Sequence, residues 1–287
     1  MTTILVTGGH GQLASCIKDV EKQYDDLDVI YTDFLELDIC DLNQVQAFFK
    51  ARKQINYCIN CAAYTAVDKA ETEVDKAFDI NAKGAKNLAF ACNEHGVVLI
   101  HISTDFVFDG QKNEPYTETD EANPISVYGA SKLQGEVEIQ HILKEHFIIR
   151  TSWLYSEHGN NFMKTMLRLA ETRDEINVVS DQIGTPTYAG DLAEVILTII
   201  DSKSESYGIY HYSNEGVASW YDFAKAIFKY SMQNIKLNKI STEEYPTPAK
   251  RPLYSVLDKE KVKGVMSLLI PNWETSLEVA ITHFVKA

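Results

Sequence analysis

The 287-residue sequence lacks an excess of positive charge: 27 basic residues stand against 41 acidic ones, for a net charge of −14. Proteins that bind nucleic acids or anionic membranes in general carry basic surfaces, so this balance argues against both kinds of partner. A small anionic ligand stays possible, because a few local cations and backbone N–H groups are enough to bind it.

Long apolar runs are also missing, and no stretch approaches the roughly 18 uninterrupted apolar residues of a membrane-spanning helix. The start, MTTILVTGGHG, has no basic segment before its short apolar run, so we expect no signal peptide. Cysteines are few and odd in number, and all lie within the first 92 residues, at positions 16, 40, 58, 61 and 92. This usage favours a reducing cytoplasm over a disulfide framework.

One cysteine pair, Cys58 and Cys61, has the CxxC spacing of redox and zinc sites. It lies within INYCINCAAY, which has the composition of a buried strand, where residues three apart point to opposite faces. We therefore expect both cysteines to be small core residues.

Strand-like and helix-like segments alternate through the first 150 residues. The strands are expected at residues 3–7, 28–33, 56–63, 97–104 and 146–152. The helices are expected at 12–23, at 41–52 with Asp41 as its cap, at 72–96 closed by Gly96, and within 124–143. Such alternation predicts an α/β fold with a doubly wound parallel sheet of the Rossmann type.

Beyond residue 152 the alternation is weaker, and residues 240–255 are proline-rich and loop-like. We expect helices at 160–173 and 191–201, and at 219–232 with Ser219 as its cap, together with strands at 176–181 and 207–213. Residues 1–152 are predicted to form a dinucleotide-binding domain. Residues 153–287 are predicted to be mainly a smaller substrate-binding lobe, with segments that return to the Rossmann sheet.

A glycine-rich turn, VTGGHGQLA, directly follows the first strand and opens the first helix. Gly8 permits a tight turn, Gly11 lets the backbone approach a pyrophosphate, and Ala14 is small enough for close helix–strand packing. Asp33 ends the second strand, where an acid can bind the ribose hydroxyls of the adenosine. A carboxylate there repels a 2′-phosphate, which favours NAD. His10 and Lys18 lie near this turn.

Tyr128 and Lys132 are four residues apart in VYGASKLQGE, and in a helix they share one face. A phenol has a pKa near 10, which a close cation would lower. The spacing alone is compatible with a surface pair as well as with a catalytic pair.

Nine ordered segments settle on one resemblance: TGGHGQLA, DICDLNQV, NCAAYTAVDKAE, HISTDFVFDG, NPISVYGASKLQGE, RTSWLY, GNNFMKTML, SDQIGTPT and TPAKRPLYSVLD. Together they resemble the extended short-chain dehydrogenase/reductases, and within them the branch of dTDP-4-dehydrorhamnose reductases, from residue 3 to about 285. The resemblance implies that Tyr128 protonates a ketone oxygen, that Thr104 binds that oxygen, and that Lys132 lowers the pKa of the phenol and holds the nicotinamide ribose. It implies NADPH or NADH as cofactor, a dTDP-sugar as substrate and a monomer or homodimer.

The resemblance also implies contacts, position by position. Those with the cofactor fall on Gly8, His10, Gly11, Gln12, Leu13, Asp33, Asp38, Ile39, Cys61, Ala62, Ala63, Tyr64, Tyr128 and Lys132. Those with the substrate fall on Thr65, Val67, Thr104, Asp105, Phe106, Trp153, Asn161, Gln182 and Arg251, whose forked guanidinium suits a diphosphate. Asn81 resembles a structural asparagine of the family.

Two positions depart from relatives of this fold. Sugar-nucleotide dehydratases resemble STDE where this chain has STDF; Phe106 cannot shuttle a proton, so dehydration is not expected. Some relatives hold Mg²⁺ at a dimer contact, and the matching position here is Cys16, a poor ligand for an ion that prefers oxygen. We therefore expect no metal. Another NDP-sugar ketoreductase or epimerase remains an alternative, as does a regulatory subunit resembling methionine adenosyltransferase β.

Overall fold

The computed structural model describes residues 1–286, and a six-stranded parallel sheet is its centre. The strand order is β10-β5-β4-β3-β1-β2. The strands are β1 (Thr2–Thr7), β2 (Leu27–Thr32), β3 (Ile55–Asn60), β4 (Val98–Thr104), β5 (His146–Thr151) and β10 (Gly208–His211). This is the doubly wound α/β fold predicted from the alternating pattern, which is thereby confirmed.

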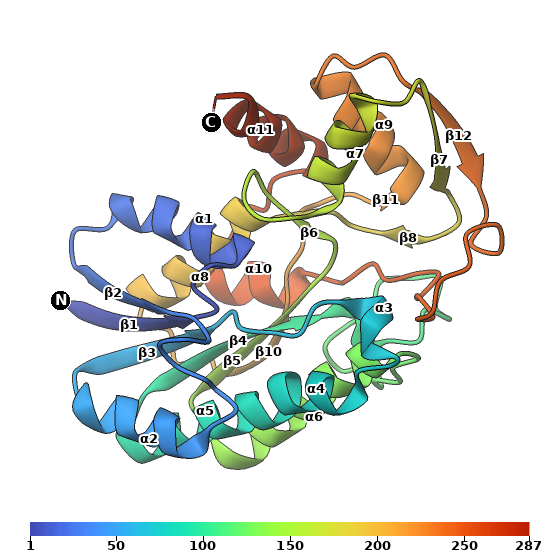
Figure 1. Ribbon diagram of the computed structural model, residues 1–287. Helices are drawn as coiled ribbons and strands as arrows, with labels where there is room; N and C mark the ends of the chain where they lie inside the picture. Colours follow the sequence, from blue (N-terminus) through green and yellow to red (C-terminus); the bar gives the residue numbers. More distant parts are fainter. Residues whose placement is uncertain (287) are drawn as a thin grey trace.

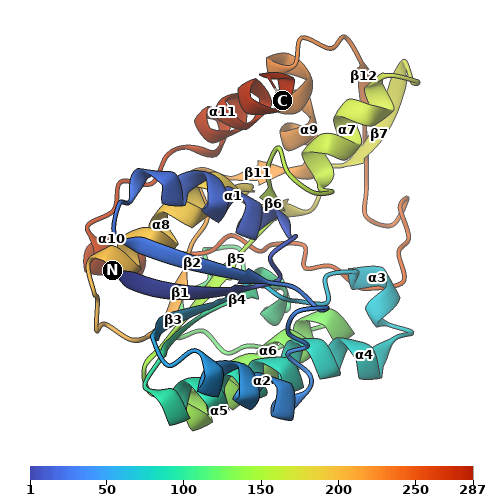
Figure 2. The ribbon, with the colours of Figure 1, turned by 60° about the vertical axis from the view of Figure 1, so that its left-hand side comes forward.

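Helices cover both faces of this sheet (Figures 1 and 2). One face carries α1 (Gln12–Val20), α8 (Ala189–Asp201) and α10 (Glu260–Met266), whose apolar side chains share a core with the sheet. The other face carries α2 (Leu42–Ala51), α5 (Ala85–His95) and α6 (Val127–Ile142). The continuous apolar runs of the central strands follow from this double coverage.

The C-terminal half contributes to two parts of the molecule. Its β10 pairs with β5, and its α8 and α10 cover the sheet. A smaller lobe at the top right of Figure 1 is built on α7 (Phe162–Ala170), α9 (Trp220–Tyr230) and α11 (Trp273–Lys286). Three two-stranded sheets accompany them: β6 (Leu154–Tyr155) with β9 (Thr187–Tyr188), β7 (Glu175–Val179) with β12 (Lys236–Ile240), and β8 (Ile183–Gly184) with β11 (Ala218–Ser219).

Helix ends follow the expected capping chemistry. The Asp41 side chain accepts hydrogen bonds from the backbone at the start of α2, and Ser219 forms a reciprocal capping box with Asp222 in α9. Gly96 closes α5 with a φ of 65°. These three caps are as predicted.

The long helix expected at residues 72–96 is wrong in one respect. The chain forms α4 (Val74–Phe78), then a π-helical turn, η2 (Asp79–Gly84), and only then α5. The short α3 (Val67–Ala70) precedes them, and the short 3₁₀ helices η1 (Glu21–Gln23) and η3 (Asp105–Val107) follow α1 and β4. π-Turns often accompany functional sites, and periodicity alone does not reveal them.

No helix within the described residues is both long enough and apolar enough to cross a membrane.

Candidate active site

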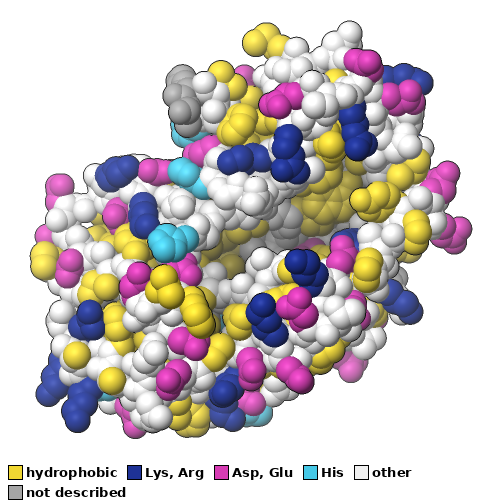
Figure 3. Space-filling view, in the orientation of Figure 1, with side chains coloured by type: hydrophobic (Ala, Val, Ile, Leu, Met, Phe, Trp, Pro, Cys, Tyr) yellow, Lys and Arg dark blue, Asp and Glu magenta, His cyan; other side chains and the backbone are white. Residues whose placement is uncertain are grey.

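A cleft of about 1050 Å³ lies at the carboxyl ends of the parallel strands, between the sheet and the smaller lobe. Figure 3 shows the molecule hollowed there, with hydrophobic side chains on the side of the smaller lobe. Ligands of open parallel sheets bind at this edge. Twenty predicted site residues line the cleft: Gly8, His10, Gly11, Gln12, Leu13, Asp33, Asp38, Ile39, Cys61, Ala62, Ala63, Thr65, Val67, Thr104, Asp105, Phe106, Tyr128, Lys132, Trp153 and Arg251.

The glycine turn has the geometry that a pyrophosphate requires. Gly8 has a φ of 66°, and a Cβ there would lie 2.7 Å from the backbone nitrogen of Ala62. Gly11 is the N-cap of α1 and offers no side-chain cap, so the first N–H groups of the helix stay available to a ligand. No acidic residue occupies the first turn of α1. The dinucleotide's phosphates therefore fit this helix start by charge and by space.

Asp33 follows β2 at the rim of this turn. Its carboxylate accepts hydrogen bonds from the backbone N–H of His10 at 2.9 Å and of Phe34 at 2.8 Å. Burial raises the pKa of Asp33, but these N–H groups and the charges of His10 and Lys18 outweigh burial and hold the pKa below its usual value. The group is therefore an anion beside the cleft, as the ribose role requires.

The segment after β3 is fixed by Asn81 of the π-turn η2. Its Oδ1 accepts from the backbone N–H of Tyr64 at 2.8 Å, and its Nδ2 donates to the Tyr64 carbonyl and to Ser131 of α6. Cys61, at the start of this segment, faces the cleft, whereas Cys58 is fully buried. Tyr64 itself is outside the cleft lining, because its ring packs against Ala70 and Ala77.

The three predicted catalytic side chains come from two adjoining elements. Thr104 ends β4, while Tyr128 and Lys132 lie on successive turns of α6. Ser126 caps this helix, and the close approach of Gly129 to the Phe106 carbonyl brings the two elements together. The helical pair is therefore buried in the cleft and is not a surface pair.

The expected effect of Lys132 on the phenol is absent from this arrangement. Burial raises the pKa of Tyr128 to about 12; the Thr104 hydroxyl lowers it and the charge of Asp105 raises it. The Lys132 ammonium instead donates to the Ile102 carbonyl at 2.6 Å and contacts His101 at 3.2 Å. The prediction that the cation lowers this pKa is thus wrong for the protein without ligands, because desolvation is the larger effect.

Asp105 is a buried acid beside the reacting centre. Its Oδ1 accepts from the Thr104 hydroxyl at 3.1 Å, whereas its buried Oδ2 has no hydrogen-bond partner. Burial raises the pKa of Asp105 to about 6, although hydrogen bonds from Ser255 and Thr104 oppose this rise. Phe106 packs edge-on against the Tyr128 ring, with centroids 5.5 Å apart. An unpartnered buried oxygen at this place suits a ligand hydroxyl.

The smaller lobe contributes an aromatic wall. Trp153 adopts a φ of 48° and packs its indole against Gly184. Trp220 stacks on Trp153 at 3.7 Å with an interplanar angle of 9°. Gln182 lies behind this wall, where its Oε1 accepts from Trp220 Nε1 at 3.2 Å. It is therefore a buried support and does not line the cleft.

Two further predicted substrate contacts have other partners. Asn161 is the N-cap of α7, and its Nδ2 donates to Gln12 at 3.2 Å, so it supports the cleft from outside the lining. Arg251 does line the cleft, but both of its terminal nitrogens bond the carboxylate of Asp68 in α3, at 3.0 and 2.9 Å. Its guanidinium is thus shared with an acid that the sequence gave no reason to pair with it.

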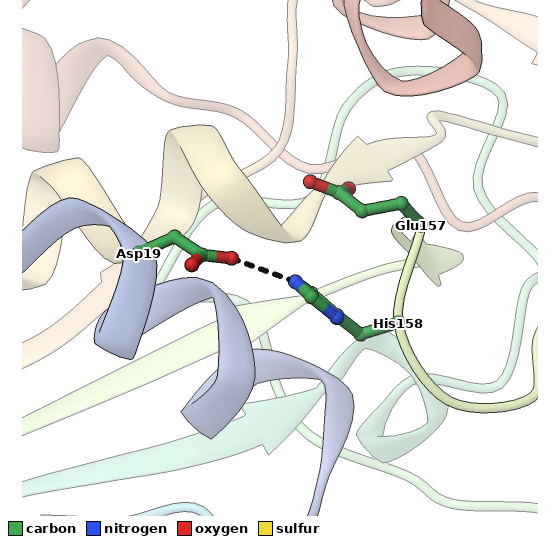
Figure 4. Close-up of side chains that lie close together, drawn as sticks. All are labelled: Asp19, Glu157 and His158. Carbon is green, nitrogen blue, oxygen red and sulfur yellow. Dashed lines mark hydrogen bonds and ion pairs between the residues drawn. The ribbon is translucent and has the colours of Figure 1, made fainter. Parts of the chain in front are cut away.

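A group with metal-binding side chains lies at the far end of α1 (Figure 4). Asp19, Glu157 and His158 offer ligand atoms within 4.8 Å of one another, and Figure 4 shows the His158 ring turned to Asp19. Asp19 and His158 form an ion pair at 2.8 Å, which already compensates both groups. Cys16 is buried nearby, and burial raises its thiol pKa to about 12, so it stays neutral. This cluster fastens the loop that carries Gly159 and Asn160 along the cleft.

Several lining residues were not predicted from the sequence. They are Phe34, Leu37, Cys40, Lys76, Asp79, Ile80, Ile102, Ser103, Thr151, Ser152, Leu154, Gly159, Asn160 and Trp220. Thr151 and Ser152 follow a predicted strand, and strand ends at this edge are the signal that would have found them. Trp220 gave no such signal, because only the crossing of the smaller lobe brings it beside Trp153.

Comparison with known proteins identifies the family. A family model described as the RmlD substrate binding domain matches residues 1–286. The chain is 43% identical to a dTDP-4-dehydrorhamnose reductase of Aggregatibacter actinomycetemcomitans, over 97% of this chain and 98% of that one. A solved dTDP-4-dehydrorhamnose reductase of Clostridium acetobutylicum has a TM-score of 0.95 and 45% identity, covering 99% of this chain and 100% of that one.

A second solved structure, the dTDP-4-dehydrorhamnose reductase of Bacillus anthracis in complex with NADP, also has a TM-score of 0.95, at 42% identity. It is covered over 100% of its length, and this chain over 99%. The chain therefore belongs to the dTDP-4-dehydrorhamnose reductase family of the extended short-chain dehydrogenase/reductases.

Proposed function

We propose that the protein reduces the 4-keto group of dTDP-4-dehydro-L-rhamnose to give dTDP-L-rhamnose, with NADPH or NADH as reductant. The observation that carries the proposal is the meeting of Thr104, Tyr128 and Lys132 with the glycine turn in one cleft. One end of that cleft suits a dinucleotide pyrophosphate, and the other has a buried phenol beside a hydroxyl. A family whose members are named for this reduction fits that arrangement.

The chain's own residues supply the proton and the stabilisation of charge. The nicotinamide, when bound, supplies a hydride to the carbonyl carbon. The Tyr128 phenol is protonated at neutral pH, because burial raises its pKa, and so it is a proton donor for the ketone oxygen. The Thr104 hydroxyl stabilises the charge that develops on that oxygen. Lys132 carries ammonium protons that can bind a ribose hydroxyl.

The cofactor would be held by the groups described above. The free N–H groups at the start of α1 face the pyrophosphate, and the Asp33 anion faces the adenosine ribose. This anion favours NADH, whereas the relative from Bacillus anthracis was solved with NADP. We therefore propose that the chain accepts both cofactors.

The substrate would occupy the part of the cleft between η3 and the smaller lobe. The unpartnered Asp105 Oδ2 is suited to a sugar hydroxyl, and the Trp153–Trp220 stack offers an apolar wall. Arg251 is the cation nearest in purpose to a diphosphate, since its fork can bind two oxygens while Asp68 holds it in place.

Dehydration and regulation without catalysis are less well supported. Phe106 occupies the position where dehydratases resemble a glutamate, and it packs on Tyr128 with no proton to give. A regulatory subunit has no need of a complete Thr104, Tyr128 and Lys132 set. An epimerase would retain its NAD through purification, which the cofactor content of the isolated protein tests.

We further propose a cytoplasmic location and a monomer or homodimer. All five cysteines are free, in agreement with a reducing compartment.

The test is oxidation of NADPH and of NADH at 340 nm with enzymatically prepared dTDP-4-dehydro-L-rhamnose. We expect dTDP-L-rhamnose as product and a loss of at least about 100-fold in rate in Tyr128→Phe, because positioned proton transfer contributes roughly 10² to 10⁴. Tyr230→Phe is the matched control, since that hydroxyl bonds Glu274 far from the cleft. Turnover that is equal in both variants would show that Tyr128 is not the acid.

A further inference from the structure

Lys132 is the end of a buried polar chain that runs beneath the cleft. Its Nζ lies 3.2 Å from His101 Nε2; His101 Nδ1 lies 3.0 Å from the Asn60 amide; and Asn60 Oδ1 accepts from Thr7 Oγ at 2.8 Å. The four side chains come from α6, β4, β3 and β1, and each is at most 2% exposed. No hydrophobic residue in a core needs such a chain, so it has a purpose in this site.

The ionisation of Lys132 decides how protons fill this chain. An ammonium can only donate, so His101 Nε2 must then be the acceptor and Nδ1 must carry the proton. The Asn60 oxygen then faces His101, and its amide nitrogen faces Thr7. If Lys132 is a neutral amine, the chain reverses: Nε2–H donates to the amine, and the Asn60 amide donates to Nδ1. His101 is uncharged in both arrangements.

We propose that His101 is a positioning residue for Lys132: its Nε2 lone pair accepts one ammonium proton, and Asn60 holds the imidazole in the tautomer that leaves this lone pair free. With the Ile102 carbonyl accepting a second proton, only one ammonium proton is left to point into the cleft. Thr7 at the other end is buried, so the chain reaches no solvent and orients the cation without conducting protons.

The surrounding charges agree with this assignment. Burial lowers the pKa of Lys132 to about 8, and the charges of Glu136 on α6 and Cys61 after β3 raise it. Burial, together with the charges of Lys132 and of His146 on β5, holds the pKa of His101 well below its usual value. A neutral acceptor therefore faces a lysine that titrates near neutrality, and each proton acceptor that the ammonium loses lowers its pKa further.

A pair of substitutions separates the two contacts of the imidazole. Glutamine places its amide near the position of Nε2 and keeps an acceptor for Lys132, whereas asparagine places its amide near Nδ1 and keeps only the contact with Asn60. The kinetic measurement is the pH dependence of kcat/KM for NADPH, which reports ionisations of the free enzyme; this arm rests on the proposed function.

We expect the alkaline limb of His101→Asn to move to lower pH by about one unit, a tenfold change in the ionisation constant of Lys132. The direction follows because the ammonium is the active form and activity is lost as pH rises through its pKa. His101→Gln keeps the limb within about 0.3 unit. A purely structural role through Asn60 predicts the reverse order, and that order would overturn the proposal.

The second measurement needs neither substrate nor turnover. The ¹⁵N shifts of the His101 ring in the free protein report its tautomer, and the resonance is assigned by its loss in His101→Gln. We expect the Nδ1–H form below the pKa of Lys132, which is about 8, and the Nε2–H form above it. Lys132→Met should show no such change with pH.

The two measurements fail separately. A ring that keeps one tautomer across this range in the wild type, or that changes equally in Lys132→Met, refutes the assignment of His101 whatever the enzyme reduces. Absence of any turnover together with the expected tautomer change refutes the proposed function and leaves the assignment standing.

Discussion

The buried ion pair between Glu136 and Arg150 offers a sharp test of how the site is held together. Glu136 lies one turn after Lys132 on α6 and is fully buried. Its two oxygens accept from Arg150 Nε at 3.0 and 3.2 Å and from a terminal Arg150 nitrogen at 2.7 Å, and Oε1 also accepts from the Ser103 hydroxyl. Glu136→Gln keeps the shape and removes the charge.

The size of the effect follows from burial. Arg150 is 3% exposed, so the substitution leaves a guanidinium charge in the core without a counter-charge. Breaking a buried pair in this way costs about 3–5 kcal/mol, which for a chain of this size lowers the melting temperature by roughly 10 °C. The negative charge that favours the Lys132 ammonium is also lost, so the alkaline limb of activity should move to lower pH.

Glu138→Gln is the matched control on the same helix. Glu138 pairs with Lys86 at 3.0 Å, but the two side chains are 23% and 41% exposed, and such pairs contribute at most about 1 kcal/mol. Thermal unfolding of both variants decides the matter. The cost of Glu136→Gln should also shrink in an Arg150→Met background, because no charge is then left unpaired. Equal melting temperatures for the two glutamine variants would refute this reasoning.

Two further predictions concern packing and pH. Gly129→Ala should destabilise the protein by about 1–3 kcal/mol, since a Cβ there overlaps the Phe106 carbonyl oxygen, whereas Gly264→Ala in α10 meets nothing within 4 Å and should stabilise it by up to about 1 kcal/mol; urea unfolding compares them, and equal effects would contradict the packing argument. Burial raises the pKa of Asp105 to about 6, so the wild type should lose about 3 kcal/mol of stability relative to Asp105→Asn as pH rises from about 4 to 6; stabilities that stay parallel with pH would contradict this.

Local sequence signals predicted the sheet and one end of the site well. The glycine turn, the caps at Asp41 and Ser219 and the end of β2 at Asp33 all depend on neighbouring residues, so spacing was enough to place them. Tyr128 and Lys132 were brought to one cleft with Thr104 by the same logic, since strand ends and the following helix meet at one edge of the sheet.

Features that depend on distant parts of the chain were not predicted. The stacking of Trp220 on Trp153 and the pairing of Arg251 with Asp68 each join segments that are far apart in sequence. The π-turn around Asn81 interrupts a pattern that is helical by composition. The pKa of Tyr128 was predicted in the wrong direction because helical spacing shows a neighbouring cation but not the depth of burial.

The central claim is that hydride from a nicotinamide reaches the keto carbon of a dTDP-sugar in this cleft. The most direct measurement uses NADPH dideuterated at the nicotinamide C4, with dTDP-4-dehydro-L-rhamnose, and analysis of the product by NMR. The account predicts dTDP-L-rhamnose with a single deuterium on the sugar C4. Product without deuterium at that carbon, or a substrate left unreduced while active relatives reduce it, would contradict the account.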